Sequence, residues 1–273
     1  MRSSSAYGRR RIPPRPTGAG QPAPIMVKET RLLMGMPITA LAQDSAATQA
    51  DLDLVFAYFQ SVDERFSPYK ASSEVSRLNR GELAIDACSD DLREALALGE
   101  QTRRETNGYF DMTRDGVCDP SGVVKGWAIQ RAADLLRARG RSSFYIDAGG
   151  DIAVAGLRDG ALWRVGIRNP FDRTQIVKAL AVTDCGVATS GTAVRGQHIY
   201  NPHDPATPLD EIVSLTVIGP NVCDADRFAT GAFAMGRAGV RFIEDLPGFE
   251  AYMIDRDGMA TYTSGFERHT LHL

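Results

Sequence analysis

The sequence predicts an α+β fold, a mixed sheet with helices built as one compact unit. Apolar residues recur at helical spacing in several segments, and strand-like segments are joined by glycine turns. These two kinds of segment do not alternate regularly, which argues against a doubly wound sheet. The 273 residues, 43% hydrophobic and 24% charged, fit one large domain or two small ones with a substantial core.

The N-terminal segment differs in composition from the rest of the chain. Residues 1–25 are rich in Ser, Arg, Pro and Gly, so we expect a disordered leader followed by a folded domain over 26–273. Three arginines at 9–11 resemble a twin-arginine signal, but no apolar segment follows them. No apolar run is long enough to span a bilayer. A cytoplasmic protein is therefore the expectation.

Charge and cysteine content exclude some function classes. The net charge of −3 lacks the basic footprint of a nucleic-acid-binding protein. The four cysteines are widely spaced and form no C-x-x-C pair, so we interpret them as reduced core thiols rather than a disulfide framework or zinc site. They are Cys88, Cys118, Cys185 and Cys223.

Helical and strand patterns follow one another along the first half. Residues 34–42 alternate as a first strand, and 49–62 carry apolar residues on one helical face. A loop is expected over 65–79. Residues 90–106 predict a second helix, with Ser89 as its N-cap.

The second half contains more strand signals. A turn-rich connection over 108–122 leads to a helix over about 124–139. Two strands joined at Gly149-Gly150 are expected within 144–156, and another strand follows at 163–170. The remaining predicted elements are β-rich stretches over 178–189 and 212–218, helices over 225–235 and 240–245, and a C-terminal hairpin over 251–263 with a turn at Asp257-Gly258.

The stretch "DPSGVVKGWA" at 119–128 suggests an anion site. It lacks the G-x-x-x-x-G-K-[ST] spacing, which excludes a nucleoside-triphosphate P-loop. Ser121 and Gly122 immediately precede the predicted helix, where free N–H groups attract anions, and Lys125 lies one turn further on. Taken alone, a plain helix start with a solvated lysine is the favoured interpretation.

The stretch "NVCDADRFATGAF" suggests a cation site. Asp226 and Thr230 are four residues apart and share one helical face. A carboxylate and a hydroxyl form a plausible pair of oxygen ligands for Mg²⁺. Asp224 is the expected N-cap. The alternative for Asp226 is an acid in the first helical turn that interacts favourably with the helix dipole.

A polar loop and two aromatic stretches are further candidates. His198 lies in a Gly-flanked loop and is a candidate general base, although a loop histidine is often simply exposed. His203 is a neighbour that complicates this assignment. Tyr109 and Phe110 could stack on a flat ring or fill the core, and Tyr69 is equally ambiguous.

Together and in this order, these segments resemble the ApbE family of flavin transferases, or FAD:protein FMN transferases. The resemblance covers most of the chain from Met34 onward, and several ordered motifs are more specific than any single one. The matching stretches are Met34-Gly35, "FSPYKASSEVSRLN", "GYFDMT", "DPSGVVKGWAIQRAADLL", "DAGGDIAVAG", "ATSG", "HIYNP" and "DADRFATGAFAMG".

The resemblance implies an enzyme that binds FAD, cleaves its pyrophosphate with the help of Mg²⁺, and joins FMN to a Thr or Ser hydroxyl of an acceptor protein, with release of AMP. By family position, His198 is the base that acts on the acceptor hydroxyl. The Mg²⁺ ligands implied are the Gly122 carbonyl, the Asp226 carboxylate and the Thr230 hydroxyl. The flavin nucleotide site implied comprises Met34, Tyr69, Tyr109, Phe110, Asp111, Asp119, Lys125 and Ile199.

The sequence departs from the family pattern in three places. Asp111 is followed almost directly by Asp119, where the family usually has several tens of residues, so a surface subregion should be missing. Asn201 replaces the Asp of the "H-I-x-D-P" motif, which affects how His198 is oriented. No cysteine precedes Cys88, so the lipid anchor of many relatives is not expected.

Two other activities stay open at this point: an FAD pyrophosphatase that transfers FMN to water, and a non-catalytic FAD-binding protein. The chain has no flavin-acceptor motif of the D-G-x-[ST]-G-A-[ST] kind. The expected partner is therefore another protein, one that carries a flavinylation motif.

Overall fold

The computed structural model describes residues 25–192 and 199–271. Its strands are β1 (Ile25–Leu33), β2 (Met36–Asp44), β3 (Thr113–Arg114), β4 (Val117–Cys118), β5 (Phe144–Ala148), β6 (Asp151–Ala155), β7 (Trp163–Arg168), β8 (Ile176–Val182), β9 (Cys185–Gly191), β10 (Ile212–Gly219), β11 (Glu250–Asp255) and β12 (Ala260–Tyr262). Its α-helices are α1 (Gln49–Phe66), α2 (Glu74–Asn79), α3 (Asp90–Glu105), α4 (Ser121–Ala138), α6 (Val222–Ala234) and α7 (Gly239–Glu244). Short 3₁₀ turns lie at Ile85–Ala87, Gly236–Ala238 and Phe266–His269.

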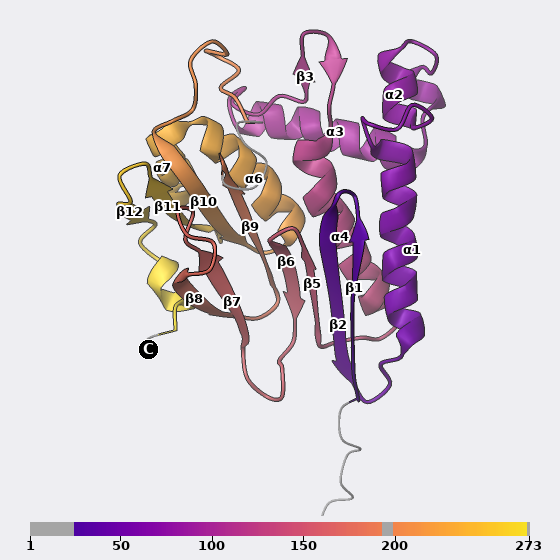
Figure 1. Ribbon diagram of the computed structural model, residues 1–273, viewed down its shortest axis with the longest axis vertical. Helices are drawn as coiled ribbons and strands as arrows, with labels where there is room; N and C mark the ends of the chain where they lie inside the picture. The colour runs from indigo at the N-terminus through magenta and orange to yellow at the C-terminus, as the bar shows by residue number, and fades with distance from the viewer. Residues whose placement is uncertain (1–24, 193–198, 272–273) are drawn as a thin grey trace, which may run out of the picture.

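One antiparallel sheet organises the described part of the chain. Eight strands pair in the order β1-β2-β5-β6-β9-β10-β11-β12, while β3–β4 and β7–β8 form separate hairpins. Figure 1 shows α1, α3 and α4 beside the β1–β2 end of the sheet, and α6 and α7 beside the β9–β12 end. The α+β prediction is confirmed.

The two faces of the sheet are buried by different partners. Alternate strand residues such as Ile38 and Ile146 pack with α1 and α4, and Leu215 packs with α6. Their neighbours on the opposite face, such as Leu41 and Val154, pack under the β7–β8 hairpin. This alternation is the period-two pattern of a strand, so helices cover one face and the hairpin part of the other.

The N-terminal elements differ from the prediction in three ways. The expected strand over 34–42 is β2, and β1 precedes it and includes residue 25, which we had assigned to the leader. Met34 and Gly35 have φ values of 52° and 71° and form the two-residue turn between these strands. The loop predicted over 65–79 contains α2, which Ser73 caps by accepting from Ser76 N.

Side-chain caps mark the start of two of these helices, and a third begins earlier than expected. Ser89 accepts from Leu92 N, which confirms it as the N-cap of α3. Helix α4 begins at Ser121, three residues before the expected start. Asp224 is not the N-cap of α6, because the Asn221 side chain accepts from Asp224 N and starts the helix three residues earlier.

The β-rich stretch predicted over 178–189 is two strands that belong to different sheets. β8 pairs with β7, whereas β9 enters the main sheet between β6 and β10. Asp184, with φ of 45°, lies in the turn between them. The connection predicted over 108–122 contains the small β3–β4 hairpin. Within the described ranges, no helix has the length and apolar character to span a membrane.

The main sheet has a gap where the candidate site lies. β9 pairs with β10 along Gly186 to Gly191 but with β6 only from Cys185 to Val187, because β6 begins at Asp151. The Asp151 side chain accepts the Thr189 backbone N–H at 3.0 Å in place of a strand partner. The sheet is therefore open beside the end of β9.

Candidate functional site

A cavity of about 930 Å³ opens at this gap. Its wall combines the β1–β2 turn, the start of α4, the β5–β6 turn, the end of β9, the middle of α6 and the β7–β8 hairpin. A volume of this size is near the upper end of the range for small-molecule sites, roughly 300–1,000 Å³. It is large enough for a ligand of dinucleotide size.

The three residues expected to bind Mg²⁺ all line this cavity. Gly122 lies in the first turn of α4, and Asp226 and Thr230 lie on consecutive turns of α6. A Cβ added at Gly122 would lie 2.9 Å from the Phe110 ring and 3.7 Å from the Thr230 methyl group. The absence of a side chain therefore lets the start of α4 approach α6 here.

A second glycine brings the two helices into direct contact. Gly126 N donates to Asp226 Oδ2 at 2.8 Å. A Cβ at position 126 would lie 2.6 Å from Asp226 Cβ and 2.9 Å from the Val222 carbonyl oxygen. Glycine is required at this crossing, and its N–H fixes the orientation of the carboxylate.

Lys125 links two buried carboxylates. Its ammonium pairs with Asp151 and lies 3.5 Å from Asp226 Oδ1, with the lysine side chain only 16% exposed. Asp151 and Asp226 are 0% and 3% exposed. The pKa of Asp226 is raised to about 8, with burial as the main cause; the adjacent Asp151 also raises it, and the Lys125 charge acts in the opposite direction. Lys125 is therefore not the solvated lysine of the alternative interpretation.

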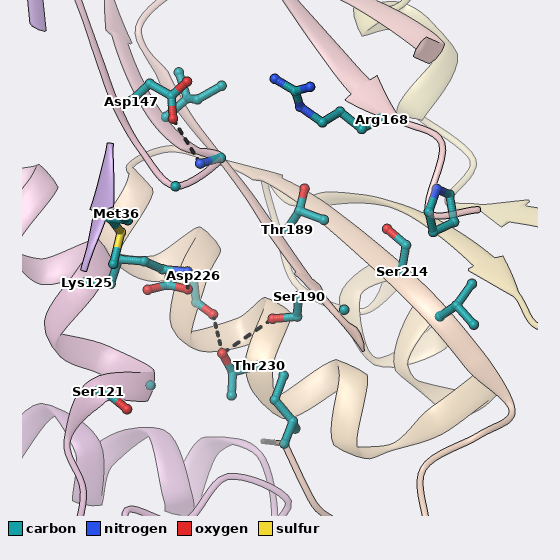
Figure 2. Close-up of a pocket in the computed structure, with 18 of the residues that line it drawn as sticks. Met36, Ser121, Lys125, Asp147, Arg168, Thr189, Ser190, Ser214, Asp226 and Thr230 are labelled. Atoms are coloured by element: carbon teal, nitrogen blue, oxygen red, sulfur yellow. Dashed lines mark hydrogen bonds and ion pairs between the residues drawn. The ribbon is translucent and has the colours of Figure 1, made fainter. Parts of the chain in front are cut away.

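Hydroxyl groups complete this end of the cavity. Thr230 Oγ1 donates to the Asp226 carbonyl at 3.1 Å and lies 3.5 Å from Ser190 Oγ. Figure 2 shows Lys125, Asp226 and Thr230 together, with Ser190 beside Thr230. Two buried carboxylates share one lysine here, and they lie beside hydroxyl oxygens. This donor set fits a hard cation such as Mg²⁺.

This set differs from a conventional cluster of metal-binding side chains. In the part of the chain that the structure describes, no group of three or more His, Cys, Asp or Glu side chains could hold a metal ion. A cation at Asp226 would need oxygen from a carbonyl, a hydroxyl, water or a ligand phosphate. Mg²⁺ usually keeps several waters and binds substrate phosphates in addition to one or two carboxylates.

The aromatic and acidic residues before α4 line the same cavity as the expected Mg²⁺ ligands. Tyr109, Phe110, Asp111 and Asp119 all line the cavity. Asp111 accepts from Thr113 N at 2.8 Å, and Asp119 accepts from Ser121 N at 3.0 Å. Both carboxylates therefore hold the local turns around the short β3–β4 hairpin as well as facing the cavity.

Two predicted flavin-site residues lie away from the cavity, and one lies outside the described residues. Met34 packs against the apolar core beside α1 and α4, while its neighbours Gly35 and Met36 line the cavity. Tyr69 is 93% exposed and is not part of the lining. Ile199 does line it. His198 falls within residues 193–198, outside the described ranges.

The segment after Ile199 is fixed to the end of α3. His203 Nε2 lies 2.9 Å from the Asn107 carbonyl oxygen, and its ring packs edge-on against Tyr109 at 4.6 Å. Asn201 Oδ1 accepts from His203 N at 2.9 Å, so the residue that departs from the family motif forms a local turn. His203 acts as an anchor, and the described cavity wall does not include it.

Sequence reasoning missed several cavity residues. Asp151 and Ser190 were read only as parts of strand and loop patterns, because their function depends on contacts with α4 and α6. Arg164 and Arg168 were read as part of a strand, although their spacing on β7 places both on one face. That even spacing was the sequence signal that could have identified the two arginines as neighbours on one face of the strand.

The fold and site define an α+β protein whose cavity suits a large phosphate-containing ligand together with a hard cation. The sequence matches the ApbE family over residues 34–119 and 116–253. The chain belongs to the ApbE family.

Individual relatives agree with this assignment. The FAD:protein FMN transferase of Vibrio cholerae is 25% identical over 282 aligned positions, which cover 81% of this chain and 84% of that protein. The FAD:protein FMN transferase of Escherichia coli K12 is 31% identical over 150 positions, covering 51% of this chain and 43% of that protein. The chain thus spans less than half of this second relative.

Solved structures show the same fold. The ApbE protein of Thermotoga maritima has a TM-score of 0.81 at 18% identity, covering 91% of this chain and all of that one. The flavin transferase ApbE of Vibrio cholerae has a TM-score of 0.78 at 22% identity, covering 90% of this chain and 99% of that one.

Proposed function

We propose that this protein transfers FMN from FAD to a Thr or Ser hydroxyl in a flavinylation motif of an acceptor protein, and that it uses Mg²⁺. The acceptor oxygen bonds to the FMN phosphorus, the bond from that phosphorus to the AMP oxygen breaks, and AMP leaves. The observation that carries the proposal is the convergence of Gly122, Asp226 and Thr230 with Lys125 at a cavity of about 930 Å³.

The residues of this convergence have distinct roles. Gly122, Asp226 and Thr230 would hold the cation, which supplies charge neutralisation for the pyrophosphate when bound. Lys125 places a fixed positive charge beside the phosphates, and Asp151 holds its ammonium in position. The N–H of Gly126 keeps the Asp226 carboxylate turned toward the cavity. Phosphoryl transfer needs mainly such positioning and electrostatics.

The flavin nucleotide would lie between the α4–α6 side of the cavity and the side formed by the β7–β8 hairpin. Tyr109, Phe110, Asp111, Asp119 and Ile199 line the side contributed by the segments around α4 and the end of β9. At the β1–β2 turn, Gly35 and Met36 line the cavity in place of Met34. Tyr69 is exposed, and neither it nor its chain neighbours line the cavity, so we leave it out of the proposed nucleotide site.

His198 is the proposed general base. It precedes Ile199, which lines the cavity, and it would accept the proton of the acceptor hydroxyl. A general base contributes about 10²–10⁴-fold to a rate. His198→Ala should therefore slow FMN transfer by about this factor while the affinity for FAD stays unchanged.

The deciding experiment incubates the purified protein with FAD, Mg²⁺ and candidate acceptor proteins and follows intact mass, flavin fluorescence and AMP. A mass increase on the acceptor equal to an FMN phosphoester, with one AMP released per acceptor, is expected. Free FMN and AMP with unmodified acceptor would instead identify an FAD pyrophosphatase. Bound but unchanged FAD would identify a non-catalytic binding protein, and either result would contradict the proposal.

A further inference from the structure

The β7–β8 hairpin carries a local excess of positive charge. Its 163–182 segment contains four basic side chains and one acidic one, although the whole protein has a net charge of −3. Three of the basic residues, Arg164, Arg168 and Arg173, are exposed and line the cavity. Figure 2 shows Arg168 projecting into the cavity from the side opposite α4 and α6.

Among the described residues, these three arginines form no ion pair with an acidic side chain, although the Arg168 charge is close enough to Asp147 to oppose the rise that burial causes in the pKa of that carboxyl. In the ranges 25–192 and 199–271, none of their guanidinium groups forms an ion pair, and the side-chain contact of Arg168 is with the Arg173 carbonyl oxygen at 3.3 Å. By contrast Lys178, the fourth basic residue, pairs with Glu267 at 3.8 Å. An unbalanced group of arginines beside a cavity attracts an anionic ligand.

The nearby carboxylates are already engaged. Asp172 Oδ1 accepts from Thr174 N at 3.0 Å and from Thr174 Oγ1 at 2.7 Å, and Asp172 Oδ2 accepts from Gln175 Nε2 at 2.7 Å. Asp147, across the cavity, accepts from Tyr145 and from Gly150 N at 3.1 Å and 2.9 Å. Neither carboxylate neutralises an arginine of the hairpin through an ion pair.

The hairpin also presents apolar side chains next to its arginines. Phe171 is 59% exposed and Ile176 is 52% exposed. The turn is held by its own hydrogen bonds, including Asn169 N to the Gln175 carbonyl at 2.9 Å and Phe171 N to Asn169 Oδ1 at 3.0 Å. An ordered turn that exposes an aromatic ring among arginines has the composition of a protein-binding surface rather than of a site for a small anion.

The phosphate-binding elements lie elsewhere in the cavity. Lys125 and the proposed cation ligands come from α4 and α6, on the helix-covered face of the sheet. The hairpin packs on the other face, over Ile152 and Val187. The hairpin and the Lys125 end are thus different parts of the cavity wall.

We propose that the β7–β8 hairpin is the docking surface for the acceptor protein, and that it recognises a segment in which carboxylates flank the acceptor hydroxyl. Arg164, Arg168 and Arg173 bind the carboxylates, and Phe171 contacts an apolar residue of the same segment. This inference rests on the proposed FMN transfer, because it names the partner chemistry of that site.

Direct binding tests the inference without requiring transfer. The probes are two synthetic peptides with a central Thr, one flanked by Asp residues and the other by Asn at the same positions. The wild-type protein with FAD bound should prefer the acidic peptide by about tenfold. Arg168→Glu and Arg173→Glu should each weaken this binding about threefold to tenfold, and the double variant more. Arg158→Glu, an exposed arginine outside the cavity wall, is the matched control.

Kinetics with a protein acceptor gives the second readout. Each hairpin variant should raise the KM for the acceptor while the Kd for FAD, measured by flavin fluorescence, stays unchanged. An acceptor with Lys in place of its flanking Asp should regain activity with the Arg168→Glu, Arg173→Glu double variant. Equal binding of the two peptides would overturn the inference, whether or not transfer occurs. Weaker FAD binding with unchanged acceptor KM would also overturn it, because the arginines would then serve the nucleotide.

Discussion

The two sides of the cavity are built in opposite ways. On the α4–α6 side, Asp151 and Asp226 are buried and Lys125 is largely enclosed, and ion pairs join the three residues across three elements. On the β7–β8 side, Arg164 and Arg168 are exposed, and the hairpin makes its hydrogen bonds mainly within itself.

This difference suggests that the buried side sets the geometry of the reacting groups, whereas the exposed side recognises a partner. A buried polar network is costly unless every member is satisfied, so it fixes one arrangement and tolerates little change. Exposed charges cost little to carry and can adapt to a partner. We therefore expect substitutions on the α4–α6 side to act on chemistry and stability, and substitutions on the hairpin to act on partner affinity. Four predictions test this division.

The largest effect is expected for Asp226→Asn. The substitution keeps the size of the side chain and a carbonyl oxygen for Gly126 N but removes the charge that would bind the cation. FMN transfer should fall by at least about 10²-fold, and stabilisation of the protein by added Mg²⁺ in thermal unfolding should disappear. Asp134→Asn, on an exposed part of α4, is the control and should behave as wild type. Full activity in the Asp226→Asn variant would show that Asp226 is not a ligand of the cation.

Asp151→Asn should have the next largest effect. The variant leaves Lys125 without its shorter ion pair, so the ammonium loses its fixed position. Loss of a residue that orients a ligand or charged group typically costs about 10–100-fold in activity or affinity. We expect this loss in the turnover number with little change in acceptor KM. A change confined to acceptor KM would show that the two sides of the cavity are not divided as we describe.

Gly126→Ala tests the helix contact. The added methyl group would meet Asp226 Cβ and the Val222 carbonyl at 2.6 Å and 2.9 Å, so α4 and α6 have to move apart. Such overpacking costs about 1–3 kcal/mol, which urea unfolding can measure. Gln130→Ala, further along α4, should change the free energy of unfolding by less than about 0.5 kcal/mol. A Gly126→Ala variant as stable as wild type would contradict the close approach of these helices.

The smallest effect is expected for Asp172→Ala on the hairpin. The hydrogen bonds from Thr174 lower the pKa of Asp172. At pH values above the ordinary pKa of an aspartate, the ionised carboxylate therefore stabilises the turn. That contribution is lost as the pH falls through the lowered pKa. At neutral pH the variant should raise acceptor KM by about twofold and leave FAD binding unchanged. Any effect on the Kd for FAD would argue that the hairpin also serves the nucleotide.

Local patterns predicted much of this fold. Ser89 caps α3 as expected, because a cap is decided within a few residues of sequence. The strands at Gly149-Gly150 were also found, because the turn requires glycine. β1 was missed because its centre, Lys28 to Arg31, is a run of polar and charged residues close to a polar leader, which interrupts the apolar pattern of a strand. Its pairing with β2, a contact between segments, identifies it as a strand.

The site was predictable only where residues lie close in sequence or match a family motif. The shared face of Asp226 and Thr230 follows from helical spacing alone. The link from Lys125 to Asp151 depends on where α4 packs against the start of β6, which no local pattern contains. Tyr69 was assigned by motif, and its exposure reflects the position of the segment before α2 on the surface.

The gap in the sheet beside β9 has a consequence for the order of binding. Thr189 and Ser190 are neighbours on one strand, point to opposite faces, and both line the cavity. The cavity wall thus includes both faces of β9, the helix-covered face and the hairpin face. Two substrates that approach from different faces do not block each other. We therefore expect either substrate to bind first, and initial-rate plots to intersect rather than run parallel, because FMN passes directly between two molecules held at the same time.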